Sequence, residues 1–582
     1  MLSSCSSPLR SSRRPGNWRV AAAVALAVAV ALPAGASTTA RTDAPAVGPT
    51  VRQIAWWADG SAATLDALAA RLRASGASVV GRLSVASGVV VEVPSTWQPP
   101  TGVMSAADRP MRVTGDAAAG ASGDQGSDDS RRGPDSGASG RGVTVAVVDT
   151  GVASVPDLPG SVQHLNVSGA AAGDGFGHGT FLAGLIASSG VSSGGRYRGI
   201  APDAGILDVQ VAAPDGSTSL LRVLAGLQAV AERARRDDSL RVVNLSLSAD
   251  DPGSPGIDPL SRALEGLWDR GLVVVVAAGN DGPEPGTVTV PGTDPAVITV
   301  GALDDKGTVT PSDDVVAPFS SRGTVGDPSP KPDLVAPGVA TVGLRAPGSV
   351  IDTKYPAARV GAANFRGSGT SMATAVVSGA VAALLSTQPE LGPDDVKAAL
   401  SAGAYAVSGD RTATGAGGLD LAATVPAAAQ IRAQQQAWSA PAVSATYQRF
   451  AAAWRKGSRS DALAAWLQLP AGLRSRLAGA WASAVAAGVV ASYDQADAAR
   501  RWATDGDLGA VWLSRSWASR SWAADDWASR SWASRSWASR SWAADDWASR
   551  SWASRSWASR SWASRSWASR SWAADDWGPR SP

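Results

Sequence analysis

Short runs of consecutive apolar residues alternate with helix-length segments through the middle of this 582-residue chain. Two segments with helical spacing, 220–235 and 260–270, lie among apolar runs at residues 143–148, 206–211, 242–247, 272–277 and 297–300. A strand that is apolar throughout is buried on both faces, and strands that are connected through helices run parallel. We therefore predict an α/β fold with a doubly wound parallel sheet.

Shifts in composition divide the chain into six predicted segments. They are a signal peptide at 1–36, a small α+β unit at 50–94, a linker rich in Gly, Ser and Asp at 95–141, the α/β domain at 142–424, a helical segment at 425–510 and a tryptophan repeat at 511–582. The α/β domain is long enough to bury a large core by itself.

The N-terminal segment has the three parts of a secretory signal. Four arginines precede an apolar run at 20–32 that is too short to span a bilayer comfortably, and Ala34-Gly35-Ala36 is a small-residue cleavage pattern. We expect export and cleavage, and the alternative is an uncleaved membrane anchor. The one cysteine, Cys5, lies in this segment, so we expect a mature protein without disulfides.

The charge of the chain does not indicate a polyanionic partner. The formal net charge is +2, and charged residues make up 18% of the chain. This balance excludes a strong overall attraction to nucleic acid or to an anionic membrane. We expect a monomer that binds no nucleic acid.

Three motifs in the α/β region carry side chains that suit one kind of chemistry. Asp149 ends a buried strand before Thr-Gly, His178 stands in Gly-His-Gly-Thr at the start of an apolar helix, and Ser371 stands in Gly-Thr-Ser-Met-Ala-Thr at the start of another. A serine hydroxyl is a poor nucleophile until a base removes its proton, and an imidazole suits that task. A carboxylate then fixes the tautomer of the imidazole. The three residues are therefore candidates for a catalytic triad.

The sequence also indicates which histidine is the base and which residue can donate to an oxyanion. The chain has two histidines, and His164 lies in what we interpret as a variable loop, which leaves His178 as the candidate base. Asn280 follows an apolar strand, where its amide and the backbone N–H of Ser371 can donate to an oxyanion. Taken singly, each residue has a structural alternative: Asp149 or Asn280 as the cap of a turn, and the histidine as a core residue.

The order Asp, His, Ser with these flanking residues resembles the subtilase family of serine peptidases. Further matching stretches are Gly199-Ile-Ala-Pro202, Asn244-Leu-Ser-Leu-Ser248, Val297-Ile-Thr-Val-Gly301, Phe319-Ser-Ser-Arg-Gly323 and Asp333-Leu-Val-Ala-Pro-Gly338. The resemblance covers residues 142–424 and implies a subtilisin-like fold. It implies that Asp149 orients His178, which acts as general base and then as acid. It also implies that Ser371 forms an acyl-enzyme and that Asn280 donates to the oxyanion.

The resemblance also implies where a substrate binds. Gly216-Ser217-Thr218 and Ser246-Leu247-Ser248 resemble the two segments that hold the substrate backbone as an added strand. Ala277-Ala278-Gly279 resembles one wall of the pocket for the side chain before the cut.

Four positions depart from the family pattern. Ala375-Val376 stands where the family commonly has Pro-His, and both Ser248 and Thr218 stand where glycine is usual. None of these residues performs bond cleavage. We therefore expect altered packing and substrate preference with an unchanged class of reaction.

The small unit at 50–94 precedes the α/β domain, as a propeptide does in the family. We expect a propeptide that is cut away by the enzyme itself between residues 94 and 142, and the alternative is a small accessory domain. The intervening linker lacks apolar periodicity, which favours proteolytic nicking.

The C-terminal segment repeats Trp-Ala-Ser-Arg-Ser, with Trp-Ala-Ala-Asp-Asp interrupting it three times. Neither an α-helix nor a strand would place a tryptophan at every fifth position on one face. Three interpretations stay open: an exposed low-complexity tail, a segment that binds a cell-envelope polymer or membrane interface, and a folded or self-associating solenoid.

Together these features predict a secreted serine endopeptidase that hydrolyses peptide bonds of a polypeptide substrate, with possible cell-envelope contact through the repeat. The alternative is a cell-envelope-binding protein whose subtilase domain is catalytically silent. Calcium often stabilises the family, but the sequence contains no dense carboxylate loop. We therefore assign no cofactor and no metal.

Overall fold

A computed structural model describes residues 49–438, apart from 59–63, 114–137, 159–161, 250–257, 309 and 325–330, together with isolated positions between 442 and 470. The predicted signal peptide at 1–36 and the tryptophan repeat at 511–582 lie outside the described residues, as does most of the segment at 425–510.

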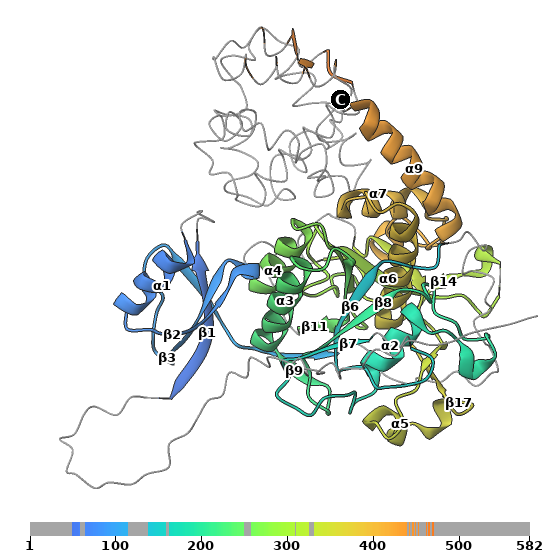
Figure 1. The fold of residues 1–582 in the computed structure, drawn as a ribbon, viewed down its shortest axis with the longest axis horizontal. Helices are drawn as coiled ribbons and strands as arrows, with labels where there is room; N and C mark the ends of the chain where they lie inside the picture. The colour runs from blue at the N-terminus through green and yellow to red at the C-terminus, as the bar shows by residue number, and fades with distance from the viewer. Residues whose placement is uncertain are drawn as a thin grey trace, which may run out of the picture. The chain divides into compact units, whose positions relative to one another are not determined.

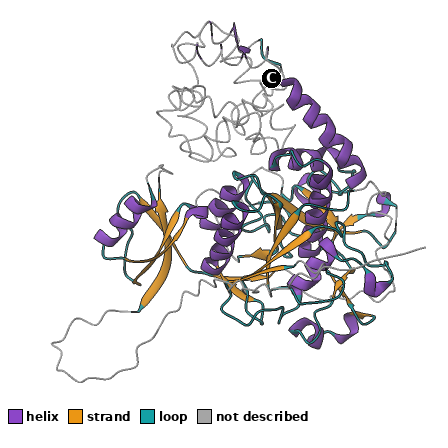
Figure 2. Ribbon diagram, in the orientation of Figure 1, coloured by secondary structure: helices purple, strands orange, loops and turns teal. Residues whose placement is uncertain are grey.

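A sheet of eight strands forms the centre of the larger domain (Figures 1 and 2). Along the sheet the order is β14-β13-β12-β10-β6-β8-β7, with β15 also paired to β13. All pairs are parallel except β13 with β14. The strands are β6 (Thr144–Asp149), β7 (Gln163–Asn166), β8 (Gly205–Gln210), β10 (Leu240–Leu245), β12 (Val273–Ala277), β13 (Ile298–Asp304), β14 (Val315–Val316) and β15 (Leu334–Pro337).

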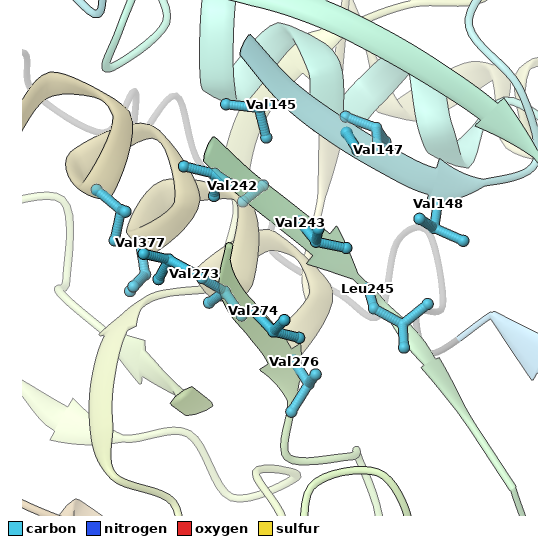
Figure 3. Packing of buried hydrophobic residues seen from close by; sticks show 14 of the residues in the cluster. Val145, Val147, Val148, Val242, Val243, Leu245, Val273, Val274, Val276 and Val377 are labelled. Carbon is cyan, nitrogen blue, oxygen red and sulfur yellow. The ribbon is translucent and has the colours of Figure 1, made fainter. Parts of the chain in front are cut away.

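Helices cover both faces of this sheet, which confirms the predicted doubly wound α/β fold. The helices α3 (Leu220–Ala234) and α4 (Pro259–Trp268) lie on one side, and α2 (His178–Ala187) and α6 (Thr370–Thr387) lie on the other (Figure 1). Valines of β6, β10 and β12 belong to one continuous core between the sheet and its helices, and Val377 of α6 packs against them (Figure 3). Burial of strand side chains on both faces explains why their sequences are apolar throughout.

The apolar run at 242–247 is divided between two sheets, contrary to the single strand that we predicted. β10 ends at Leu245, and β11 (Leu247–Ser248) pairs in a separate three-stranded sheet with β5 (Pro110–Val113). The buried Ser246 lies between them. Two strands that follow each other without a turn residue cannot be separated by apolar periodicity alone.

The N-terminal unit is a four-stranded antiparallel sheet with one helix. Its strands follow the order β2-β3-β1-β4, and a separate small core lies between the sheet and the helix. The elements are β1 (Thr50–Trp57), α1 (Leu65–Ala74), β2 (Ser78–Leu83), β3 (Gly88–Pro94) and β4 (Val103–Ala107).

The predicted boundaries of this unit and of the α/β domain need correction. The linker does not begin at residue 95, because β4 pairs with β1 and β5 follows it. The sequence of β4, Val-Met-Ser-Ala-Ala, lacks a clear alternation of apolar and polar residues. The domain does not end at residue 424 either, because α9 (Leu421–Trp438) runs across that position and packs against α7 (Pro393–Gly403).

The helix α6 has the length and apolar composition of a membrane span, and it was the one such helix found among the described residues. It is largely buried, since 83% of its 18-residue apolar window lies inside the structure. This burial is typical of the core helix of a folded domain.

A buried group of charges joins the sheet to α7. The carboxylate of Asp333 accepts hydrogen bonds from Lys331 Nζ at 2.8 Å and from the backbone N–H of Thr299 at 2.8 Å, and Lys397 Nζ lies 3.1 Å from its other oxygen. Burial acts to raise the pKa of Asp333, but the charges of Lys331 and Lys397 outweigh it and lower that pKa. Burial lowers the pKa of Lys397 to about 8. Asp333 therefore compensates two ammonium groups that water cannot reach.

Asp333→Asn is expected to lower the free energy of unfolding by about 3–5 kcal/mol, because it leaves two buried ammonium groups without a counter-charge. Urea denaturation followed by circular dichroism measures this loss. Asp304→Asn is the matched control, because Asp304 is only partly buried and pairs with the exposed Lys306; it should cost about 1 kcal/mol or less. Equal losses in the two variants would contradict the assigned role of Asp333.

Candidate active site

The end of β6 and the start of α2 bring an acid and an imidazole into contact. Nδ1–H of His178 donates to Oδ1 of Asp149 at 2.8 Å, and both side chains are buried, with exposed fractions of 1% and 0%. The backbone N–H of Thr150 donates to the same carboxylate oxygen at 2.8 Å. These bonds fix the orientation of the carboxylate and the tautomer of the imidazole.

A glycine lets the two backbones approach each other. A Cβ added to Gly179 would lie 2.2 Å from the carbonyl oxygen of Gly151 and 3.3 Å from Cβ of Asp149. Both glycines belong to the predicted motifs. The presence of Gly179 is explained by this close approach between the strand end and the first turn of the helix.

The second nitrogen of the imidazole, Nε2 of His178, is buried and has no hydrogen-bond partner among the described residues. Burial acts to lower the pKa of His178, but the charges of Asp149 and Asp174 and the hydrogen bond with Asp149 raise it overall. A buried nitrogen that can accept a proton, beside an anion that stabilises the protonated form, has the properties of a general base.

Ser371 lies in the first turn of α6 and is buried. The helices α2 and α6 pack together, and a side chain from each lies near Gly367 of β18 (Asn364–Gly367). A Cβ at Gly367 would lie 3.0 Å from Cε of Met372 and 3.3 Å from Cζ of Phe181. Met372 directly follows Ser371, and Phe181 comes three residues after His178.

Asn280 is held against the start of α6. Its Oδ1 accepts hydrogen bonds from the backbone N–H of Thr370 at 2.9 Å and from the hydroxyl of Thr370 at 3.1 Å. With Oδ1 engaged in this way, Nδ2 is the group of Asn280 that remains to donate to a ligand. The neighbouring Gly279 donates its N–H to the same hydroxyl at 3.2 Å.

The two predicted substrate segments each pair with β5, a strand supplied by the chain itself. The sheet has the order β11-β5-β9, where β9 is Ser217–Ser219, and both pairs are antiparallel. Within it the backbone of Arg112 lies opposite both Ser217 and Ser248. Met111 lies opposite Thr218 and is buried, with 3% of its surface exposed.

The other predicted substrate residues border these strands. Gly216 immediately precedes β9 with a φ of +81°, and an added Cβ would meet the ring of Phe176 at 2.9 Å. Ser246, between β10 and β11, and Leu247, the first residue of β11, are both buried. Ala277 ends β12, and Ala278 donates its N–H to Val300 at 3.0 Å.

The predicted loop around His164 is wrong, because this residue lies in β7 at the edge of the sheet. Its Nδ1 lies 2.8 Å from Oδ2 of Asp208 on the adjacent β8, so the second histidine also has a carboxylate partner. The strand was missed because its four residues, Gln-His-Leu-Asn, are mostly polar. An edge strand can expose such residues.

Sequence reasoning missed Asp174, a buried carboxylate whose charge acts on His178. A signal was available, since Asp174 stands four positions before His178 in a glycine-rich segment that precedes a helix start. Aspartate near a helix N-terminus is typical of capping.

The described residues contain no group of three or more His, Cys, Asp or Glu side chains placed to hold a metal ion.

The fold and this arrangement define a subtilase, and comparison with known proteins agrees: residues 140–422 match the model of the subtilase family of peptidases. The chain belongs to this family. It is 44% identical over 271 residues to serine protease AprX of Bacillus subtilis (strain 168). The aligned region covers 45% of this chain and 61% of that protein. It is 33% identical over 261 residues to subtilisin Savinase of Lederbergia lenta, which spans 44% of this chain and 80% of that protein.

The fold is also that of a solved structure. Fervidolysin from Fervidobacterium pennivorans, a keratinolytic enzyme related to subtilisin, matches with a TM-score of 0.50 and 23% sequence identity. The match covers 65% of this chain and 61% of that one. This likeness supports the architecture of the sheet and its helices.

Gly179→Ala is expected to lower the melting temperature, because its methyl group would overlap the backbone of Gly151 at the point where Asp149 and His178 meet. Overpacking of this kind costs about 1–3 kcal/mol. Differential scanning calorimetry measures the change. In the control Gly81→Ala the new Cβ would lie 3.6 Å from Val90, an ordinary contact, and the melting temperature should change little. If Gly179→Ala had the same melting temperature as the unsubstituted protein, this close approach would not be required for stability.

Proposed function

We propose that the protein is a serine endopeptidase whose catalytic triad is Asp149, His178 and Ser371. The observation that carries the proposal is the buried hydrogen bond from His178 to Asp149, which leaves Nε2 without a partner among the described residues. An imidazole in this state can accept the proton of a hydroxyl. The start of α6 carries Ser371, the serine that we propose as the nucleophile.

In the proposed reaction, Nε2 of His178 takes the proton of Ser371 as Oγ attacks the carbonyl carbon of the peptide bond. Negative charge develops on the carbonyl oxygen, where Nδ2 of Asn280 and the backbone N–H of Ser371 donate hydrogen bonds. His178 then gives its proton to the leaving amine, and the acyl group stays on Ser371. Water deprotonated by His178 hydrolyses this acyl-enzyme, and the proton returns to Ser371.

The proposed substrate is an extended polypeptide that binds between β9 and β11. A chain in this position completes an antiparallel sheet through its main-chain N–H and C=O groups. The pairing of β5 with both strands supports this mode of binding, because β5 is itself an extended segment of polypeptide.

Ser371→Ala is expected to abolish labelling by a fluorophosphonate probe and to lower kcat on a peptide library by about 10⁶, the loss known for subtilisins without this serine. Ser378→Ala is the matched control, because Ser378 lies in the same helix and donates to Asn244 away from the imidazole. It should be labelled like the unsubstituted protein. An unsubstituted protein that takes up no probe would instead favour the catalytically silent, envelope-binding alternative.

We also propose that the N-terminal unit is a propeptide that β5 anchors in the substrate site. Contacts between this unit and the α/β domain support the assignment. The backbone N–H of Val85 donates to Gln228 of α3 at 3.0 Å, and Nε of Arg262 donates to the carbonyl of Ala86 at 3.4 Å. Arg109, just before β5, forms an ion pair with Asp258 at the start of α4.

Mass spectrometry of the secreted protein is expected to find a new N-terminus between residues 114 and 142. The reason is that β5, which ends at Val113, lies between β9 and β11, where we propose that a substrate binds. Ser371→Ala should retain residues 50–113, whereas Ser378→Ala should be trimmed like the unsubstituted protein. Trimming of Ser371→Ala to the same N-terminus would show that another protease cuts the chain.

Secretion through the segment at 1–36, contact with the cell envelope through the repeat at 511–582 and a monomeric state stay predictions from the sequence. We propose the first because a basic start, an apolar run and a small-residue cleavage pattern occur in that order.

A further inference from the structure

Asp174 lies in the loop before α2, and four hydrogen bonds converge on its carboxylate. Oδ1 accepts from the hydroxyl of Thr150 at 2.8 Å and from the backbone N–H of Gly177 at 2.6 Å. Oδ2 accepts from the backbone N–H of Thr180 at 2.8 Å and from its hydroxyl at 2.6 Å. Each carboxylate oxygen is thus met by two donors.

These donors come from both of the segments that form the acid–base pair. Thr150 directly follows Asp149, and Gly177 directly precedes His178. The hydroxyl of Thr150 also accepts from the N–H of Gly179 at 3.0 Å, and its backbone N–H donates to Asp149. Asp174 therefore connects the end of β6 to the first turn of α2 around the hydrogen bond between Asp149 and His178.

The hydroxyl groups in this network have fixed donor directions. That of Thr180 accepts from the N–H of Ala153 at 2.9 Å, and that of Thr150 accepts from Gly179, so each is left to donate its proton to Asp174. Burial raises the pKa of Asp174, and its hydrogen bonds with Thr180, Gly177 and Thr150 oppose the rise. A carboxylate surrounded by donors alone is stabilised in its ionised form.

Several charged groups face this region. The charges of Asp149 and Asp174 both act to raise the pKa of His178. Asp208 of β8 also faces Asp174, and burial raises its pKa to about 6 against the contact with His164. The two carboxylates nearest to His178 thus lie on different elements, one at the end of a strand and one in a loop.

We propose that Asp174 is a positioning residue that locks the Asp149 and His178 segments together and adds a second negative charge that stabilises the imidazolium. This inference rests on the proposed peptidase function for its catalytic consequence. Its structural and electrostatic parts concern His178 alone and can be measured without turnover.

The decisive experiment is an NMR titration of histidine labelled at 13Cε1. The chain has two histidines, so His178 and His164 can be assigned by replacing His164 with Gln. The titration uses the full chain in a Ser371→Ala background, which prevents self-cleavage. In Asp174→Asn we expect the His178 midpoint to move to lower pH, because removal of a nearby negative charge destabilises the imidazolium.

Asp157→Asn provides the matched control. Asp157 is also a buried carboxylate, but its Oδ1 accepts from the N–H of Ser192 beyond the end of α2. This variant should leave the His178 midpoint unchanged. A His178 titration in Asp174→Asn that superimposes on that of the parent would overturn the inference.

Turnover supplies the second readout, with Ser371 intact. We expect Asp174→Asn to lower kcat by about 10–100-fold with KM nearly unchanged, because small displacements of catalytic groups have effects of this size. The acid limb of kcat/KM should move to lower pH together with the His178 midpoint, since only neutral His178 can act as base. A loss of melting temperature with an unmoved acid limb would show a merely structural role and would count against the inference.

A second pair of variants keeps the test decisive if Asp174→Asn does not fold. Thr150→Val removes the hydroxyl that joins Asp174 to Gly179 and should lower kcat, whereas Thr150→Ser retains the hydroxyl and should restore it. Equal kcat in the two variants would overturn the positioning role. A shifted His178 titration supports the inference even in a chain that cleaves no peptide, and the absence of cleavage would then count against the proposed function alone.

Discussion

The buried hydrogen bond between Asp149 and His178 is the constraint on which the rest of the site depends. A carboxylate and an imidazole that lose their hydration are stable only if other polar groups replace the water. The chain achieves this by ending a central strand and starting a helix at one point, where Gly179 lets the two backbones touch. Because Nδ1 of the imidazole is engaged by the carboxylate, Nε2 is left to face a reacting group.

The parallel sheet explains how residues far apart in the sequence reach this point. β6, β10 and β12 run in the same direction, so the residues that follow them gather at one edge of the sheet. Asp149 ends the first of these strands, and Asn280 comes shortly after the last. The helix α6 packs against the strands of the sheet, and hydrogen bonds also join the two: Thr370 binds Asn280, which follows β12, and Ser378 binds Asn244 of β10.

The sequence was sufficient to predict strands and site residues that are marked by a short local motif. It was insufficient where contacts between distant segments determine the structure. Asp149, His178 and Ser371 could be singled out because each lies in a short motif at a predictable strand end or helix start, and the apolar runs indicated the sheet. β5 could not be predicted, since its four residues include a proline and an arginine and are a strand only because β9 and β11 pair with them. Asp174 was missed for a related reason: its role depends on Thr150, which belongs to another segment of the chain.

The position of β5 also bears on how the proposed enzyme selects its substrates. Main-chain pairing with β9 and β11 is available to any extended segment, so it contributes affinity without discriminating between sequences. Discrimination then has to come from side chains that the site encloses. In β5 the side chain of Met111 is buried, whereas its neighbour Arg112 is exposed. A site that encloses Met111 favours an apolar residue at that position, because an enclosed apolar side chain gains free energy from leaving water.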